Sequence, residues 1–357
     1  MFRWIFVFLL VVIIEVYAFQ AFRTLTKVKS YQFIYLILNL VIIIYIINGF
    51  FHFDRNVGQT KQTLFTVGLL LLVSVPKILI TFVLIGEDIF RIFSGMLTRF
   101  LGDNDYGNFL PERRKFVSQV AYGIAAIPFL SFLYGITKGK YNFKVIKQTL
   151  SIPDLPDNFD GFTFAQISDI HSGSFDNPEK IQYAVDLINK QDFDLLLFTG
   201  DIINSDATEM HPWIDTFKGL KNPTFGKYSI LGNHDYGTYK NWPSDKAAAD
   251  NFENVKDLHR QIDFKLLLDE HVKIKKGDQE IAIVGVENWG KNFGEKGDID
   301  KASMNLTKDD FKILLSHDPT HWEFVVKNHE KHFQLTLSGH THGFQFGIEI
   351  PGIIKWS

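Results

Sequence analysis

The sequence predicts an α-helical membrane region followed by an α/β domain, and two observations support this prediction. Residues 1 to 137 are dominated by long apolar runs, whereas from about residue 150 onward short apolar runs alternate with stretches of helical periodicity. In the second part, five short runs end in a turn that carries Asp, Asn or His. We therefore expect a transmembrane region of about four helices over residues 1–137, a linker over 138–160 and an α/β domain over 161–357.

The composition excludes several classes of function. A net charge of −3 over 357 residues gives no basic bias, so we expect no nucleic-acid partner. The chain contains no Cys, which excludes disulfides and Cys-ligated zinc. The absence of Cys is compatible with either side of a membrane.

Four apolar stretches predict membrane-spanning helices, because each approaches the roughly 20 residues that cross a bilayer. They are Trp4–Phe22, Tyr31–Phe51, Leu64–Ile85 and Phe116–Tyr134. The alternative for the first is a signal peptide, but no small-residue cleavage site follows it and three further spans do. We expect a multi-pass protein of the cell (inner) membrane, with membrane lipids as partners.

Two charged residues, Glu15 and Lys77, lie inside the first and third predicted spans. A charge inside a membrane is costly and usually faces a partner or a cavity. Pairing of Glu15 with Lys77, snorkelling toward the interface and a functional pathway all stay open.

The orientation in the membrane is nearly undecided by charge, since seven basic residues flank the spans on one side and eight on the other. Arg113 and Arg114 precede a moderate apolar run and resemble a twin-arginine export signal, the alternative being an ordinary basic flank. Both readings favour this loop inside and the α/β domain on the extracytoplasmic side. Four spans place the N-terminus and that domain on one side.

Between the last span and the α/β domain, Pro153 and Pro156 suit an extended linker.

The α/β part reads as short strands separated by helices. The expected strands are Phe162–Ser168, Leu195–Thr199, Tyr228–Leu231, Leu266–Leu268, Val272–Ile274, Ile281–Val286, Phe311–Leu315 and Gln334–Leu337. The expected helices are Ile181–Ile188, Thr208–Leu220 with an early interruption at Pro212, Ala247–Gln261 and Trp322–Asn328.

Five of these strands end in residues that bind metals, and sheets of this type place ligands beyond the carboxyl ends of their strands. The candidate metal ligands are Asp169, His171, Asp201, Asn233, His317, His340 and His342. Carboxylate, amide and imidazole without thiolate suit Mn, Fe or Zn better than calcium. Seven ligands exceed the need of one ion, so we expect two divalent metal ions bridged by Asp201, whose strand lies between those of Asp169 and Asn233.

The motifs Asp-x-His, Gly-Asp, Gly-Asn-His-Asp, a His before Asp-Pro and Gly-His-Thr-His resemble the calcineurin-like metallophosphoesterase family over about residues 162–343. The resemblance implies a four-layer α-β-β-α sandwich. It implies one metal held by Asp169, His171, Asp201 and His342, and a second held by Asp201, Asn233, His317 and His340. It also implies catalytic roles for His234, which would contact the substrate phosphate, and for Asp235, which would steady the imidazole of His234.

With its membrane spans, the chain resembles the bacterial membrane-anchored group of this family. We therefore expect a binuclear phosphoesterase that hydrolyses a phosphate or pyrophosphate ester of a small molecule or a lipid by attack of a metal-bound hydroxide. One alternative is a UDP-2,3-diacylglucosamine pyrophosphatase-like hydrolase of lipid A synthesis, whose substrate is made in the cytoplasm. An alternative of another class is a non-catalytic membrane scaffold or transport component.

Two further expectations concern the remaining residues. The family usually carries more strands after Gly-His-Thr-His, so residues 161–357 are expected to be truncated at the C-terminus, with Ile348–Trp356 as a loop or strand start. Six other histidines lack the strand-end context and are expected on the surface: His211, His259, His271, His321, His329 and His332.

Overall fold

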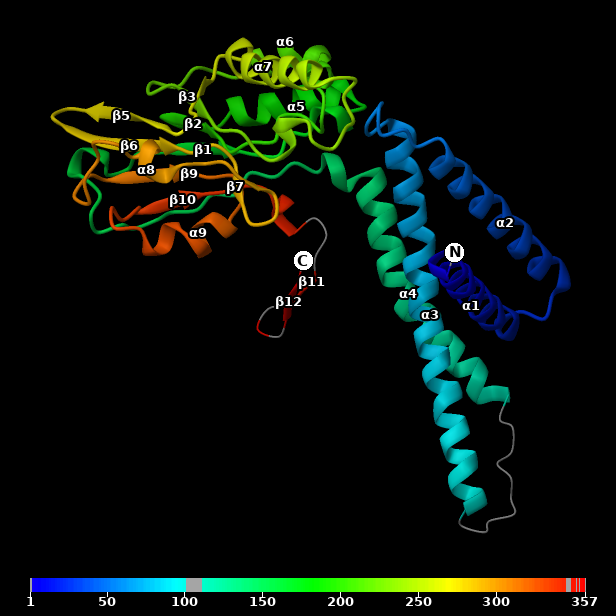
Figure 1. The fold of residues 1–357 in the computed structure, drawn as a ribbon. Coiled ribbons are helices and arrows are strands. Elements are labelled where there is room, and N and C mark those ends of the chain that lie inside the picture. Colours follow the sequence, from blue (N-terminus) through cyan, green and yellow to red (C-terminus); the bar gives the residue numbers. More distant parts are fainter. Residues whose placement is uncertain (1, 101–110, 345–347, 351, 353, 357) are drawn as a thin grey trace. The chain divides into compact units, whose positions relative to one another are not determined.

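The computed structural model describes residues 2–100, 111–344, 348–350, 352 and 354–356. The chain divides into two compact units (Figure 1). The helical unit comprises Met1–Phe53 and Lys61–Phe143, and the α/β unit comprises Asp54–Thr60 and Lys144–Ser357. The α/β unit begins again at Lys144, inside the linker expected over residues 138–160. The later part of that linker belongs to the α/β unit, because Ile152, Leu155 and Phe159 pack in its core.

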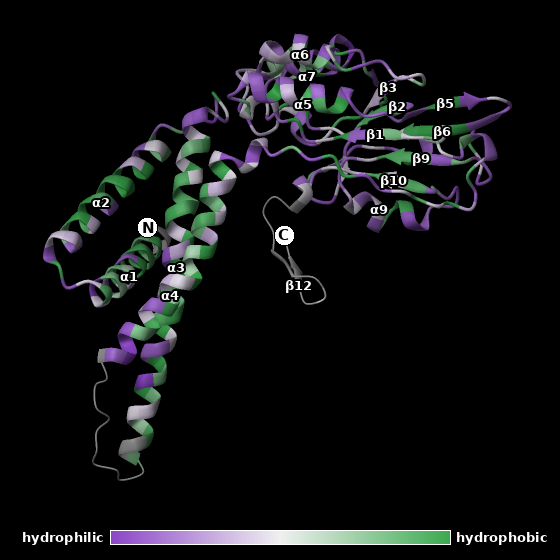
Figure 2. Cartoon of the chain, turned by 180° about the vertical axis from the view of Figure 1, so that it is seen from behind, coloured by the Kyte–Doolittle hydropathy of each residue, from purple (hydrophilic) through white to green (hydrophobic). Residues whose placement is uncertain are grey.

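Four helices form the helical unit, at the positions where membrane spans are expected. They are α1 (Phe2–Leu25), α2 (Lys29–Phe51), α3 (Lys61–Phe100) and α4 (Pro111–Thr137). All four are long and apolar enough to cross a membrane, and only 11–28% of the most apolar window of each is buried within the chain. Hydrophobic residues therefore cover the surfaces of these helices (Figure 2), which is typical of a lipid-facing bundle.

Helix α3 is longer than expected and continues past Ile85 to Phe100. Glu87 and Asp88 follow directly after the apolar run of the third span. In the structure Arg114 of α4 binds both carboxylates, and its Nη1 lies 2.9 Å from Oδ1 of Asp88. Tyr17 of α1 donates its hydroxyl to Asp88. These ion pairs connect α3 with α4 and give Arg114 a structural role besides any role in export.

Glu15 and Lys77 pair with each other, as one of the open alternatives proposed. Nζ of Lys77 lies 2.6 Å from Oε1 of Glu15. The same ammonium donates to Oδ1 of Asn39, so that α1, α2 and α3 meet at this charge. In an apolar environment such a pair is retained where it holds helices in register.

Two four-stranded sheets form the α/β unit. The first is parallel, in the order β1 (Phe164–Ile167), β2 (Leu195–Phe198), β3 (Lys227–Ser229) and β4 (Lys265–Leu266). The second has the order β10 (Leu335–Leu337), β9 (Lys312–Leu315), β6 (Gln279–Gly285) and β5 (Glu270–Lys276). In it, β10, β9 and β6 are parallel and β5 is antiparallel.

The sheets face each other across one apolar core. Leu195 and Leu197 of the first sheet pack in the same cluster as Ile283, Ile313 and Leu315 of the second. Alternate residues of β2, such as Leu196 and Phe198, are also fully buried, because period 2 turns them to the opposite face.

Helices cover the outer faces of both sheets (Figure 1). The first sheet carries α5 (Pro178–Asn189), α6 (Ile214–Lys218) and α7 (Asp245–Gln261). The second carries α8 (Ile299–Ala302) and α9 (Thr320–Phe324), with Ile299 and Ala302 packed against Val284 and Leu314. The expected helical region plus four-layer α-β-β-α sandwich is confirmed.

Several local expectations were incomplete. The single helix expected over Thr208–Leu220 is divided into a 3₁₀ segment (Ala207–Trp213) and α6 (Ile214–Lys218). Pro212 accounts for the division, because it has no backbone N–H to donate. A short hairpin of β7 (Trp289–Gly290) and β8 (Gly294–Glu295) was not anticipated. Strands β11 (Ile348–Ile350) and β12 (Ile354–Trp356) pair antiparallel, while residues 351 and 353 lie outside the described residues.

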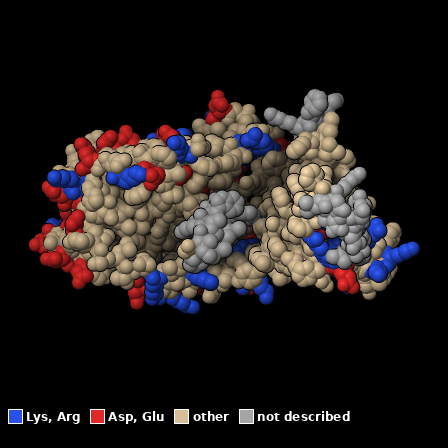
Figure 3. All heavy atoms as spheres, turned by 90° about the horizontal axis from the view of Figure 1, so that it is seen from below, with Lys and Arg blue, Asp and Glu red and all other residues tan. Residues whose placement is uncertain are grey.

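Charged side chains of both signs are mixed on the α/β unit. At the left of Figure 3, Asp and Glu side chains lie beside Lys and Arg side chains around the edge of the visible face. This mixture agrees with the net charge of −3.

Candidate metal centre

The seven candidate ligands all follow the carboxyl ends of parallel strands. Asp169 and His171 follow β1, Asp201 follows β2, and Asn233 follows β3 in the first sheet. His317 follows β9, and His340 and His342 follow β10 in the second sheet. Because the sheets face each other, ligands from both reach the same place, although 173 residues separate Asp169 from His342.

The backbone around these residues is strained. Of the ten described non-glycine residues with positive φ, five are candidate ligands: Asp169 (53°), His171 (46°), Asp201 (63°), His340 (68°) and His342 (49°). A residue other than Gly has a steric penalty at positive φ, and residues in this conformation cluster at functional sites. Two loop contacts hold the strained segment, the N–H of Asp169 to the carbonyl of Gly200 (3.0 Å) and the N–H of His171 to the carbonyl of Asp201 (3.1 Å).

Two glycines allow the loops to approach closely. A Cβ at Gly232 would lie 2.2 Å from Oδ1 of Asp201, and a Cβ at Gly339 would lie 1.9 Å from Oγ of Ser168. Any side chain at either position would therefore displace the loop that carries a candidate ligand.

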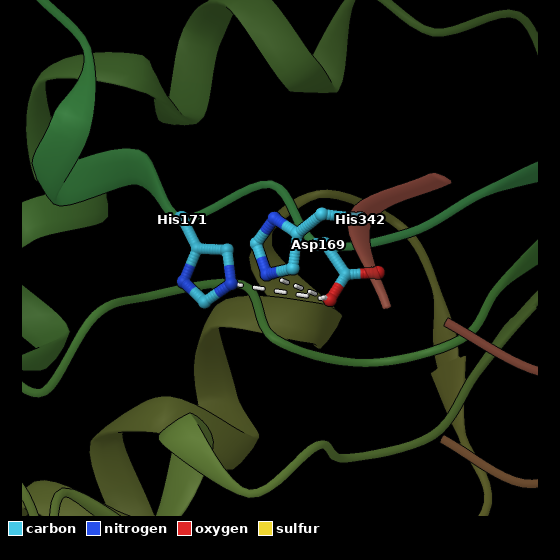
Figure 4. Close-up of side chains that lie close together, drawn as sticks. All are labelled: Asp169, His171 and His342. Atoms are coloured by element: carbon cyan, nitrogen blue, oxygen red, sulfur yellow. Dashed lines mark ion pairs between the residues drawn. The ribbon is translucent and has the colours of Figure 1, made fainter. Parts of the chain in front are cut away.

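Asp169, His171 and His342 form the first cluster (Figure 4). Oδ1 of Asp169 lies 3.6 Å from Nε2 of His342 and 3.9 Å from Nε2 of His171. The two imidazoles stack with 4.9 Å between centroids. Nδ1 of His171 faces Oδ1 of Asn204 at 3.1 Å, which leaves Nε2 directed at the carboxylates.

Asp201, His317 and His340 form the second cluster. Nε2 of His317 lies 3.1 Å from Oδ2 of Asp201, and Nδ1 of His317 donates to the carbonyl of Thr199. Nδ1 of His340 lies 2.9 Å from Oδ1 of Asn233. Asp201 also groups with His171 and His234, so its carboxylate lies between the two clusters.

Three buried ligand atoms at the centre make no hydrogen bond within the described part of the chain. They are Nε2 of His171, Oδ2 of Asp201 and Nε2 of His317. Oδ2 of Asp201 meets the other two atoms only as close contacts, at 3.1 Å from His317 and 3.4 Å from His171. Buried polar atoms without hydrogen bonds are costly, so a further partner is expected. Once His317 gives up its proton, nitrogen atoms of two imidazoles and an oxygen of a carboxylate converge, which fits a divalent cation, and the mixed N and O donors suit Mn, Fe or Zn.

The charges at the centre favour metal-binding protonation states in most residues. Burial lowers the pKa of His171 to about 4 and also lowers the pKa of His340, so both imidazoles are neutral at neutral pH. Burial disfavours the charge of Asp201, but the neighbouring His317 and His171 outweigh it and lower its pKa. His317 differs, because the field of Asp201 overcomes burial and raises its pKa to about 9.

His234 lies beside both clusters. Its backbone N–H donates to Oδ1 of Asp201 (2.9 Å), and its Nδ1 donates to the carbonyl of Asn204 (2.8 Å). Its ring stacks on Tyr239 with 4.2 Å between centroids. These contacts fix Nδ1 as the donor and leave Nε2 for the site.

Asp235 does not hold the imidazole of His234, contrary to expectation. Its fully buried carboxylate accepts from the backbone N–H groups of Asp201, Ile202 and Gly232 at 2.8–2.9 Å. Burial beside Asp201 raises the pKa of Asp235, and the three N–H donors oppose that rise. Asp235 therefore holds the turns after β2 and β3 together.

Three residues at the centre were not predicted from sequence. Asn204 contacts both His171 and His234, and Tyr239 accepts from Nδ2 of Asn233 at 2.8 Å. Asp318 is 1% exposed, and its Oδ2 lies 3.6 Å from Nε2 of His340. The sequence could have indicated Asp318, because it directly follows the candidate ligand His317. For Asn204 and Tyr239 the only such indication is that they lie a few residues after Asp201 and Asn233.

Two other histidines are buried, which makes the expectation of surface positions wrong for them. His259 is 0% exposed and packs on Phe198, and His321 is 1% exposed and packs on Trp289. Burial lowers the pKa of His259 to about 3 and that of His321 to about 4, so both are neutral core rings.

Both units match family models. Residues 162–344 match the model described as "Calcineurin-like phosphoesterase", and residues 2–140 match the model described as "Probable Calcineurin-like phosphoesterase, transmembrane domain".

Curated relatives of the chain carry the word metallophosphoesterase in their names. The chain is 30% identical to "Uncharacterized metallophosphoesterase YkuE" of Bacillus subtilis (strain 168), over 58% of this chain and 68% of the relative. It is 26% identical to "Transmembrane protein with metallophosphoesterase domain" of Danio rerio, over 60% of this chain. The chain spans about half of the latter relative, 47% of its length.

Among solved structures, the chain is similar to a 5'-nucleotidase precursor from Thermus thermophilus, with 14% identity and a TM-score of 0.33 over 51% of this chain and 42% of that chain. It is also similar to a phosphopantetheinyl hydrolase from Mycobacterium tuberculosis, with 12% identity and a TM-score of 0.31 over 53% of this chain and 86% of that chain.

Metal affinity is expected to rise with pH from about 6.5 to 9. Without metal, His317 is protonated below its raised pKa of about 9, and a metal must displace that proton from Nε2. The gain is up to about tenfold per pH unit and levels off above the pKa. Titration calorimetry of Mn²⁺ in two buffers of different ionisation enthalpy measures the released proton. A pH-independent affinity with no proton release would contradict the prediction.

The substitution Asp318→Asn is expected to weaken Mn²⁺ binding by about tenfold or more. Oδ2 of Asp318 is buried without a hydrogen-bond partner in the described part of the chain and lies 3.6 Å from Nε2 of His340. Its carboxylate favours the proton on Nε2, and that tautomer leaves Nδ1 for a metal beside Asn233. Calorimetry measures the affinity. Asp300→Asn, a surface carboxylate whose side chain is 79% exposed, is the matched control. Equal affinities in the two variants would refute the role of Asp318.

Proposed function

Because this chain belongs to the calcineurin-like phosphoesterase family, we propose that it is a membrane-anchored hydrolase that uses two divalent metal ions to cleave a phosphate or pyrophosphate ester. One observation carries the proposal: the buried, unpaired ligand atoms of His171, Asp201 and His317 converge from two facing sheets. The family makes the chain a metal-dependent phosphoester hydrolase. The number of ions and the substrate are our proposals.

The two clusters suggest how the ligands divide. We assign one ion to Asp169, His171 and His342 and the other to Asn233, His317 and His340, with Asp201 shared between them. The central place of Asp201 supports the bridging role. Mn, Fe or Zn suits the mixed oxygen and nitrogen ligands.

Two such ions would supply charge stabilisation for the phosphoryl oxygens and lower the pKa of a bound water. His234 would hold and deliver a proton. With Nδ1 bonded to the carbonyl of Asn204, its imidazolium form presents Nε2–H to the leaving oxygen. Stacking on Tyr239 restricts the ring to that orientation. Asp235 would act as a positioning residue through the turns it binds.

The four apolar helices favour a lipid or membrane-surface substrate, because anchoring confines the enzyme to the plane where such a substrate lies. The alternative of UDP-2,3-diacylglucosamine depends on the face of the membrane, since that substrate is cytoplasmic. A non-catalytic scaffold would be expected to have lost some of the metal ligands. In this chain all seven candidate ligands are present, and the family is one of phosphoesterases.

We place the α/β unit on the extracytoplasmic side of the cell membrane, together with the N-terminus. Four spans return the chain to its starting side. Arg113 and Lys115 at the start of α4 favour the cytoplasmic side for the opposite loop.

Asn233→Ala and His340→Ala are each expected to reduce Mn²⁺-dependent hydrolysis of bis(p-nitrophenyl) phosphate by on the order of a hundredfold or more, because each removes a ligand from the same ion. The full chain in detergent micelles serves for the assay, with metal content measured in parallel. His211→Ala, an exposed histidine away from the site, is the control. Turnover unchanged in the ligand variants would refute the assignment.

Because the chain contains no Cys, single Cys variants report the membrane side without background. Glu330→Cys, on the surface of the α/β unit, is expected to react with a membrane-impermeant maleimide in intact spheroplasts, whereas Lys27→Cys, between α1 and α2, should react only after permeabilisation. The reverse pattern would place the α/β unit in the cytoplasm and would readmit the UDP-linked lipid A precursor.

A further inference from the structure

A cavity of about 230 Å³ adjoins the candidate metal centre inside the α/β unit. It shares Asn233 with the second cluster. Its wall also includes Tyr236, Tyr239, Asn288, Phe293 and Lys296. We call it the leaving-group pocket.

Two aromatic walls connect the pocket to the site residues. Tyr239 accepts a hydrogen bond from Asn233 and stacks on His234. The ring of Phe293, in the β7–β8 hairpin, packs edge-on against His340 with 4.6 Å between centroids. A group in the pocket therefore contacts Asn233 and Tyr239, and Tyr239 in turn stacks on His234, the residue to which the proposed function gives the proton of the leaving oxygen.

Asn288 contributes an unused acceptor. The side chain is 1% exposed, and its Nδ2 donates to the carbonyls of Phe293 (2.8 Å) and Gly294 (3.2 Å), which fixes the orientation of the amide. Its Oδ1 is buried and has no hydrogen-bond partner in the described part of the chain. A buried acceptor of this kind needs a donor, and a ligand hydroxyl would be one.

Lys296 contributes the charge. It is the one charged side chain among the described residues that line the pocket. Its Nζ lies 3.9 Å from the ring centroid of Tyr236, and its backbone N–H donates to the carbonyl of Asn288, which ties it to the same wall. An ammonium at the rim favours an anionic ligand group.

We propose that the leaving-group pocket selects substrates whose leaving group carries both an anionic group, bound by Lys296, and a hydroxyl, bound by Oδ1 of Asn288. This inference rests on the proposed function and narrows its substrate class to esters of a phosphorylated sugar or polyol. In the reaction, the oxygen of water bonds to phosphorus, the P–O bond to the leaving group breaks, and the leaving oxygen takes a proton. The volume admits a group of that size and is below the usual range for drug-sized ligands.

The test compares two substrates with the Mn²⁺-loaded full chain in detergent. UDP-glucose has a phosphorylated, hydroxylated leaving group whichever P–O bond of its pyrophosphate breaks, whereas the p-nitrophenolate released from bis(p-nitrophenyl) phosphate carries no phosphate and no hydroxyl besides its leaving oxygen. We expect Lys296→Met to lower kcat/KM for UDP-glucose by about tenfold or more and to leave the aryl diester within about twofold. Lys296→Arg should retain activity on both.

Lys291→Met is the matched control, because Lys291 lies in the same hairpin but contacts Phe324 outside the pocket. An equal loss on both substrates in Lys296→Met, or no loss on either, overturns the inference while the proposed function stands. Wild-type protein that hydrolyses neither substrate with Mn²⁺ overturns the proposed function itself. Unchanged metal content and circular dichroism show that the Lys296 variants fold.

Discussion

The burial of Asp201 is the constraint on which the centre depends, because a buried carboxylate needs compensation on every side. Its Oδ1 accepts from the backbone of His234, and its own N–H donates to Asp235. Its Oδ2 faces His171 from the first sheet and His317 from the second. One side chain thus connects turns that follow three strands, and each turn is shaped to meet it.

The strands and the candidate ligands could be predicted from sequence because both depend on local patterns, whereas the four-layer sandwich was implied by the resemblance to the family. Short apolar runs that end in Gly-Asp or Gly-Asn mark buried parallel strands, and the carboxyl ends of such strands meet by geometry. The pattern therefore brought Asp169, Asp201 and His317 into one set without any knowledge of the sheet order. The apolar helices are equally local, since a span is defined by length and composition.

The errors arise where side-chain direction or distant compensation decides the outcome. Asp235 follows His234 in sequence, but the 3₁₀ turn at His234–Tyr236 directs its carboxylate to backbone groups of the neighbouring loop. The apolar run that predicts a span ends at Ile85, but helix α3 continues through Glu87, whose partner Arg114 lies 27 residues later in the sequence. The β7–β8 hairpin has strands of two residues, too short for any periodicity, and it is held by the amide of Asn288.

The strained turns have a consequence for the life of the protein in the cell. Left-handed Asp and His residues and unpaired buried atoms cost stability in the metal-free chain, and a bound ion offsets that cost only once both sheets have assembled, since the unfolded chain holds these ligands far apart. With the proposed ions as ligands of these turns, metal supply would set how often the turns open and how long the α/β unit survives proteases. Under metal starvation the enzyme would be lost by turnover as well as by inactivity, so its abundance would follow the metal content of its compartment.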